Sequence, residues 1–281
     1  MPIIQRIIRN LLKPHLIPYK LINKLNFIYK KNNYEKTFFE NHQNEIFRKL
    51  NLDREKGLDK LRELKQQYNF LDRNMSSEHE VLFSSLSLLS KKKFNKILEI
   101  GTFDGVNSFL LSLLFEDSQI KTIDLRSDED DFVNHYNRKD NVSEFVNSRN
   151  KITSKSSNIN FKELNSIKLC NLSEKFDLIW IDGAHGYPMV CIDIINSLKL
   201  IDQNGLIMCD DIYKKKVNSD KMYNSVAAFE TLVELKKENI IDLELIYKGL
   251  DAENNCDEKN RKLVAIFKKL KIINHAHQKQ D

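Results

Sequence analysis

The chain has 281 residues, of which 41% are hydrophobic and 30% charged, and its formal net charge is +5. This composition is typical of a globular protein with a sizeable core, and the small net charge argues against a nucleic-acid-binding protein. No apolar run reaches the roughly 18–20 residues that are needed to span a bilayer.

Residues 1–75 are predicted to form a basic helical extension. Residues 1–35 carry seven lysines and arginines against one acid, and the apolar residues of segment 3–12 recur at helical spacing. This first helix would either lie on a membrane surface or pack against the main domain or a second subunit. We favour packing, because short basic amphipathic helices are common. A second helix-prone region covers residues 35–70.

From residue 76 onward, short apolar runs alternate with helical patterns. This alternation predicts an α/β fold for residues 76–281, namely a Rossmann-like, doubly wound, mostly parallel seven-stranded sheet with helices on both faces. Ligands bind beyond the carboxyl ends of the strands in such sheets, so strand ends matter most. The predicted strands are 96–100, 120–125, 159–164, 176–181, 206–209, 243–247 and 263–267.

A long polar segment, residues 127–157, interrupts this alternation between the second and third predicted strands. We expect one helix within it, near residues 142–150. A segment of this length is often a lid or a binding loop, and the alternative is a mobile surface.

The first two predicted strands end in residues suited to a nucleoside. Glu99, Gly101 and Gly105 form an E-x-G-x-x-x-G pattern before a helix, where glycines permit a tight turn and the helix N-terminus favours an anionic group. The pattern differs from the G-x-G-x-x-G of dinucleotide binding. Asp124 ends the second strand, where a carboxylate can accept both hydroxyls of a ribose. Together they indicate an adenosine-type cofactor.

The next three predicted strands also end in polar residues. Asn165 and Ser166 suit either the edge of an adenine or a capped turn. Asp182 ends the fourth strand and Asp210 with Asp211 ends the fifth, so three carboxylates are expected to meet. Like charges this close need a compensating cation or proton, and oxygen ligands suit Mg²⁺. The alternative, that these aspartates cap helices, is less favoured because two strand ends share the pattern.

The ordered set of these motifs resembles the class I S-adenosylmethionine-dependent methyltransferases over about residues 76–270. The resemblance rests on the E-x-G-x-x-x-G pattern, Asp124, "WIDGAHGY" and "NGLIMCDD". It is strongest to the methyltransferases with an "IDGAH…DD" signature, and the chain is similar also to cation-dependent O-methyltransferases of the catechol and macrolide-sugar types. Relatives often have serine in place of Asn107 and glycine in place of Asn204, and the catechol type has Asn in place of Asp211.

The resemblance implies a role for each strand end. The methionine part of the cofactor is expected to lie against Glu99, Gly101, Thr102, Gly105 and Asn107. Asp124 would hold the ribose hydroxyls, adenine would lie by Asn165 and Ser166, and Asp182 would border the cofactor. Asp182, Asp210 and Asp211 match the metal-ligand positions of the cation-dependent enzymes, with Mg²⁺ or a similar divalent ion as the expected metal.

These roles suggest methyl transfer from S-adenosylmethionine to a hydroxyl of a sugar, a glycan precursor or another small molecule. The metal would place and activate that hydroxyl. His185, three residues after Asp182, would either take the proton or hydrogen-bond the turn, and the two alternatives carry equal weight. The lysines at 214–216 would attract an anionic substrate, or are simply solvated.

Two other classes of function remain open at this point. A nicotinamide-dependent dehydrogenase would use a similar sheet, but the glycine pattern does not support it. A non-catalytic, membrane-associated assembly protein would rest on the basic segment 1–35. The cysteines form no C-x-x-C pair, which favours reduced thiols in a cytoplasmic protein. Segment 1–35 could also contact the inner face of the membrane peripherally. The sequence leaves a homo-oligomer open.

Overall fold

The computed structural model describes residues 34–71, 77–90, 94–134, 140–215, 225–251 and 261–270, together with Ile22, Leu25 and Tyr29. Its strands are β1 (Lys96–Ile100), β2 (Gln119–Asp124), β3 (Ile159–Glu163), β4 (Phe176–Ile181), β5 (Ile201–Ile212), β6 (Ile241–Tyr247) and β7 (Leu263–Lys269). All seven predicted strands are confirmed. The largest difference is the early start of β5, which occurs because its first residues form an irregular ladder whose register against β4 shifts between Phe176 and Leu178.

The strands form one sheet in the order β3-β2-β1-β4-β5-β7-β6. Strands β1 to β5 pair in parallel, whereas β7 runs antiparallel to both β5 and β6. The sheet is therefore Rossmann-like and mostly parallel, as predicted. Because β7 is reversed, the carboxyl end of β6 and the start of β7 lie at the same edge as the carboxyl ends of β1 to β5.

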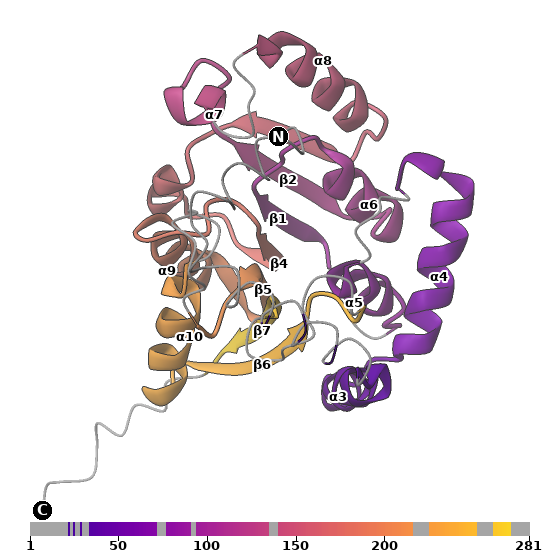
Figure 1. Ribbon diagram of the computed structural model, residues 1–281. Helices are drawn as coiled ribbons and strands as arrows, with labels where there is room; N and C mark the ends of the chain where they lie inside the picture. Colours follow the sequence, from indigo (N-terminus) through magenta and orange to yellow (C-terminus); the bar gives the residue numbers. More distant parts are fainter. Residues whose placement is uncertain are drawn as a thin grey trace, which may run out of the picture.

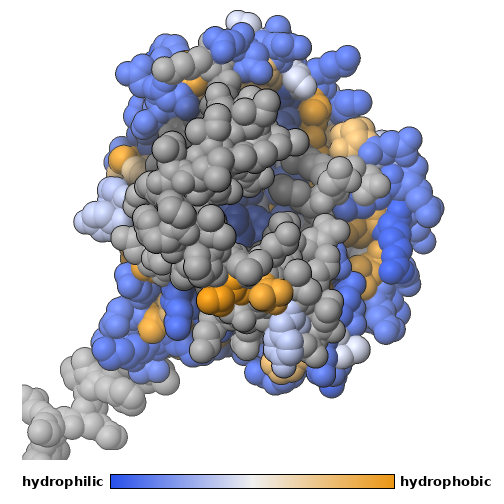
Figure 2. Space-filling model, viewed as in Figure 1, coloured by the Kyte–Doolittle hydropathy of each residue, from blue (hydrophilic) through white to orange (hydrophobic). Residues whose placement is uncertain are grey.

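Helices cover both faces of the sheet (Figure 1). One face carries α9 (Met189–Leu200) and α10 (Ala227–Lys237), and the other carries α4 (Arg54–Gln67), α5 (Glu78–Ser87) and α6 (Val106–Leu114). Each face has its own hydrophobic cluster, so the central strands are buried on both sides and read as continuous apolar runs. The outer surface over α4 and α8 is mostly hydrophilic (Figure 2).

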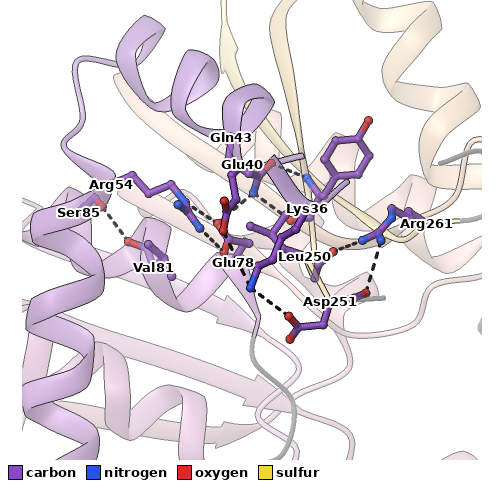
Figure 3. A network of polar contacts seen from close by, with 12 residues as sticks. Lys36, Glu40, Gln43, Arg54, Glu78, Val81, Ser85, Leu250, Asp251 and Arg261 are labelled. Carbon is purple, nitrogen blue, oxygen red and sulfur yellow. Dashed lines mark hydrogen bonds and ion pairs between the residues drawn. The ribbon is translucent and has the colours of Figure 1, made fainter. Parts of the chain in front are cut away.

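The described part of the N-terminal extension packs against the sheet domain. Helix α3 (Lys36–Lys49) lies beside β6 at the sheet edge, and Phe47 and Leu61 belong to the same hydrophobic cluster as Trp180 of β4. Gln43 and Arg54 both donate hydrogen bonds to Glu78 at the start of α5 (Figure 3). The helix predicted at residues 3–12 lies outside the described residues, and no described helix is long and apolar enough to cross a membrane.

The polar segment 127–157 contains α7 (Asp130–Asn134) and α8 (Val142–Thr153). The helix expected near residues 142–150 is therefore confirmed, and a second short helix was not predicted. Arg149 of α8 is buried, with its guanidinium 4.1 Å from the ring centroid of Phe161 and 3.5 Å from Glu163. These contacts fix α8 against β3.

Candidate active site

The turn between β1 and α6 is where the predicted glycines act. Gly101 and Gly105 have φ angles of 102° and 80°, in the left-handed region that favours glycine. A Cβ atom on Gly101 would lie 2.3 Å from the carbonyl oxygen of Asp182, and one on Gly105 would lie 2.8 Å from a methyl group of Thr153. The glycines therefore let the ends of β1 and β4 approach each other, and let α8 close over the turn.

Glu99 is directed into the protein interior. Its carboxylate accepts hydrogen bonds from Asn107 (Nδ2, 2.7 Å), from Thr122 (Oγ1, 2.6 Å) and from the Ser108 hydroxyl. Complete burial raises the pKa of Glu99 to about 7, although these donors lower it in part. Thr102 is equally buried and shares a 2.6 Å hydrogen bond with Thr122. Both side chains thus shape the turn from within.

Asp124 ends β2 at the mouth of this turn. Its two carboxylate oxygens accept hydrogen bonds from the backbone N–H groups of Phe103 and Leu125, both at 2.8 Å. The carboxylate is half-buried and is held in place by these two bonds. A carboxylate held in this way could accept hydrogen bonds from the diol of a ribose, and that role of Asp124 stays a prediction.

The end of β3 supports the turn interpretation for Asn165. Its side chain accepts a hydrogen bond from Ile167 N at 3.1 Å and so caps the short helix η4 (Ser166–Asn171). The carbonyl of Ser166 accepts from Asn196 Nδ2 of α9 at 3.2 Å. Contact of these residues with adenine stays a prediction.

The ends of β4 and β5 bring the expected acidic residues near His185. His185 Nε2 lies 3.7 Å from Asp182 Oδ1 and 3.8 Å from Asp211 Oδ2. Successive residues of a regular strand point to opposite faces, but here the register of β5 against β7 shifts between Cys209 and Ile212, and Asp211 has a φ of 55°. This irregularity lets Asp210 and Asp211 share one partner.

That partner is a lysine which the sequence analysis missed. The ammonium group of Lys248 contacts Asp210 Oδ2 and lies 2.6 Å from Asp211 Oδ1, and the ammonium group of Lys262 contacts Asp211 Oδ2. Lys248 directly follows β6 and Lys262 directly precedes β7. The sequence therefore held a signal. Lys248 follows a predicted strand, and Lys262 precedes one that runs antiparallel to its neighbours, so both lie at the edge where ligands bind.

Residues 98–212 match the family model described as a methyltransferase domain. This match runs from the glycine turn to Asp211 and agrees with the resemblance to methyltransferases over these residues. The matched residues span the central part of the seven-stranded Rossmann-like sheet. No curated protein matches the chain.

Several solved methyltransferase structures are similar to the chain at low identity. The N-methyltransferase NodS from Bradyrhizobium japonicum WM9 is 16% identical with a TM-score of 0.49, and the match covers 69% of this chain and 96% of that one. Podospora anserina methyltransferase PaMTH1 is 14% identical with a TM-score of 0.48, over 90% and 96%. The O-methyltransferase TomG from Streptomyces achromogenes is 14% identical with a TM-score of 0.46, over 74% and 88%. These similarities do not identify a substrate.

The divalent-metal site predicted for this methyltransferase fold is not formed by the described residues. Asp182, Asp210 and Asp211 are all present at the site, yet no group of three or more His, Cys, Asp or Glu residues is placed to hold a metal ion in the described ranges. The physical reason is the position of Lys248, whose ammonium group already bridges the acidic pair. The residues in this arrangement do not fit a divalent cation.

His185 is buried beside this charged cluster. Burial lowers the pKa of His185, although Asp211 and Asp210 raise it in part. For Asp211, burial would raise the pKa, but the ammonium groups of Lys248 and Lys262 outweigh this effect and lower it. His185 is therefore a neutral imidazole near pH 7 beside an ionised carboxylate, which is the state that can accept a proton.

Proposed function

We propose that this chain transfers a methyl group from S-adenosylmethionine to a hydroxyl group of a small molecule, with a sugar or glycan precursor as the acceptor. The observation that carries the proposal is the contact between two half-sites. Gly101, in the turn that Asp124 helps to hold, lies against the backbone of Asp182, three residues before His185. A nucleoside bound at Asp124 would thus lie next to a group able to take a proton.

Each half-site would contribute one part of the reaction. S-adenosylmethionine supplies the methyl group on a positively charged sulfur. His185 would accept the hydroxyl proton while the acceptor oxygen bonds to the methyl carbon and the carbon–sulfur bond breaks, leaving a methyl ether and S-adenosylhomocysteine. The fixed turn and Asp124 would hold the two reacting centres in line, which by itself removes much of the entropic cost of their encounter.

Assistance by Mg²⁺ is expected from the three neighbouring carboxylates and from the sequence resemblance. The contacts of Lys248 with the acidic pair do not support it, so no step of the proposed reaction passes through a metal.

Isothermal titration of the full chain with S-adenosylmethionine tests the first half of the proposal, and absence of binding overturns it. Titration with NAD⁺ is the matched control, because a dehydrogenase with this fold would bind that cofactor instead. Labelled S-adenosylmethionine, incubated with a small-molecule extract and read by mass spectrometry, would then identify the acceptor and show whether oxygen is the methylated atom.

A further inference from the structure

We propose that Lys248 supplies the positive charge of this active site in place of a divalent cation, so that methyl transfer proceeds without an added metal. The inference rests on the proposed function for its link to methyl transfer. The assignment of the charge itself rests on contacts alone.

Lys248 makes the two contacts that a bridging cation would make. Its ammonium group touches one oxygen of Asp210 and one oxygen of Asp211, which are 1% and 9% exposed at their side chains. Two carboxylates this deeply buried would repel each other without a cation between them. Lys262 adds a second ammonium group on the other oxygen of Asp211. The acidic pair is therefore compensated by the chain itself.

The backbone of Lys248 is held on both sides. Its N–H donates to the carbonyl of Lys262 on the neighbouring strand, and its carbonyl accepts from the N–H of Glu78 at the start of α5, both at 2.9 Å. One residue earlier, the amide of Gln43 in α3 pairs with both the N–H and the carbonyl of Tyr247. The N-terminal helices thus fix the strand end from which Lys248 reaches the site.

A metal ion would have to displace this lysine. The ammonium group of Lys248 already contacts one oxygen of each aspartate, and that of Lys262 contacts the other oxygen of Asp211. A divalent ion at the same two oxygens would lie within a few ångströms of two ammonium groups, and repulsion between like charges at such distances is strong inside a protein.

The position of Lys248 also suggests how it serves the reaction. An ammonium group has three N–H donors, and the two aspartates take two of them. Lys248 remains 21% exposed at its side chain, and Asp211, which it contacts, is also the neighbour of His185. The third donor can therefore face the acceptor oxygen as His185 removes its proton, which makes Lys248 a positioning residue for the acceptor.

Binding of Mn²⁺ alone, followed by electron paramagnetic resonance on the full chain, tests the assignment, since Mn²⁺ favours the same oxygen ligands as Mg²⁺. We expect no binding to the wild type up to about 1 mM, the weak end of protein sites for hard cations. Lys248→Met would release Asp210 and Asp211 together and create a site, so its Mn²⁺ affinity should rise at least roughly tenfold. Lys121→Met is the matched control, because Lys121 is a similarly half-buried lysine paired with Glu174 away from the site.

Wild-type binding of Mn²⁺ that is lost in Asp210→Asn would overturn the proposal, as would a folded Lys248→Met protein that binds no Mn²⁺. Thermal melting establishes whether that variant folds, and if it does not, the wild-type and Asp210→Asn titrations decide alone. S-adenosylmethionine titrated into the same samples separates the two proposals. A chain that binds neither ligand refutes the methyltransferase proposal but not the charge assignment.

Discussion

The two halves of the site are built in different ways. The cofactor half, at the ends of β1 and β2, is made of residues close in sequence, and Asp124 is held there by backbone N–H groups. The acceptor half, at the ends of β4 to β7, is made of ion pairs between distant residues, such as Asp210 with Lys248 and Asp211 with Lys262.

This difference suits one half of the site to cofactor binding and the other half to proton transfer. Neutral backbone donors give Asp124 a fixed direction, which suits recognition of a defined cofactor. The acceptor half gathers opposite charges around one imidazole, which suits proton transfer. Variants in one half should therefore leave the function of the other half intact, and each prediction below tests that separation.

The largest effect is expected from His185→Gln. Loss of the proton acceptor should lower the methyl-transfer rate roughly 100- to 10,000-fold, while affinity for S-adenosylmethionine stays unchanged. In the wild type the rate should rise with pH through a pKa below the ordinary histidine value, because burial disfavours the protonated form, and should be level near neutral pH. A variant that keeps the wild-type pH profile would assign His185 to the turn instead. Rates measured across pH at saturating cofactor decide between these outcomes.

Asp124→Ala should affect the cofactor half alone. Two charge-assisted hydrogen bonds to a ribose contribute about 3 kcal/mol, so the Kd for S-adenosylmethionine should increase roughly 100-fold. The rate at saturating cofactor should change little. Asp128→Ala is the matched control, since Asp128 is exposed and pairs with Arg126. Equal affinities of the two variants in calorimetry would show that the ribose is not bound at Asp124.

Glu99→Gln tests the buried interior of the cofactor half. The raised pKa means that folded protein keeps a proton on Glu99 between about pH 4.5 and pH 7, where the unfolded chain releases it. This group's contribution to stability is thus lost as pH rises through that window. Relative to the wild type, Glu99→Gln should gain at most about 3 kcal/mol of unfolding free energy from pH 4 to pH 8. Denaturant unfolding at both pH values measures this change, and the exposed Glu63→Gln should show none.

The fold and the glycine turn beside Asp124 could be predicted because their signals are local. Apolar runs separated by helical patterns gave the strands, and the glycines with Asp124 follow strands by fixed, short intervals. The position of Asp182 at the end of β4 follows from the same rule. What local patterns could not show is that Glu99 and Thr102 face inward, since this depends on hydrogen bonds to Thr122 of the neighbouring strand.

The acceptor half shows the limit of such reasoning. Three carboxylates at neighbouring strand ends correctly indicated a need for positive charge, and a metal was the expected source. The positive charge beside Asp210 is instead that of Lys248, which lies 38 positions further along the chain and directly follows β6. The sequence places Lys248 after a predicted strand, but its contact with Asp210 depends on the order of the strands at this end of the sheet, which tertiary packing decides.

The smallest effect is expected from Gln43→Ala, which tests whether the N-terminal helices support the acceptor half. Gln43 is fully buried, and its amide bonds to Tyr247 and Glu78, so truncation leaves buried polar groups without partners and should cost about 2 kcal/mol of stability. For a chain of this size that lowers the Tm by roughly 4–8 °C. The exposed Gln66→Ala should melt like the wild type.

Cofactor affinity should be unchanged in Gln43→Ala, whereas acceptor KM should rise, because the strand end that carries Lys248 loses its support. A rise in cofactor Kd instead would show that the two halves are coupled through the N-terminal helices.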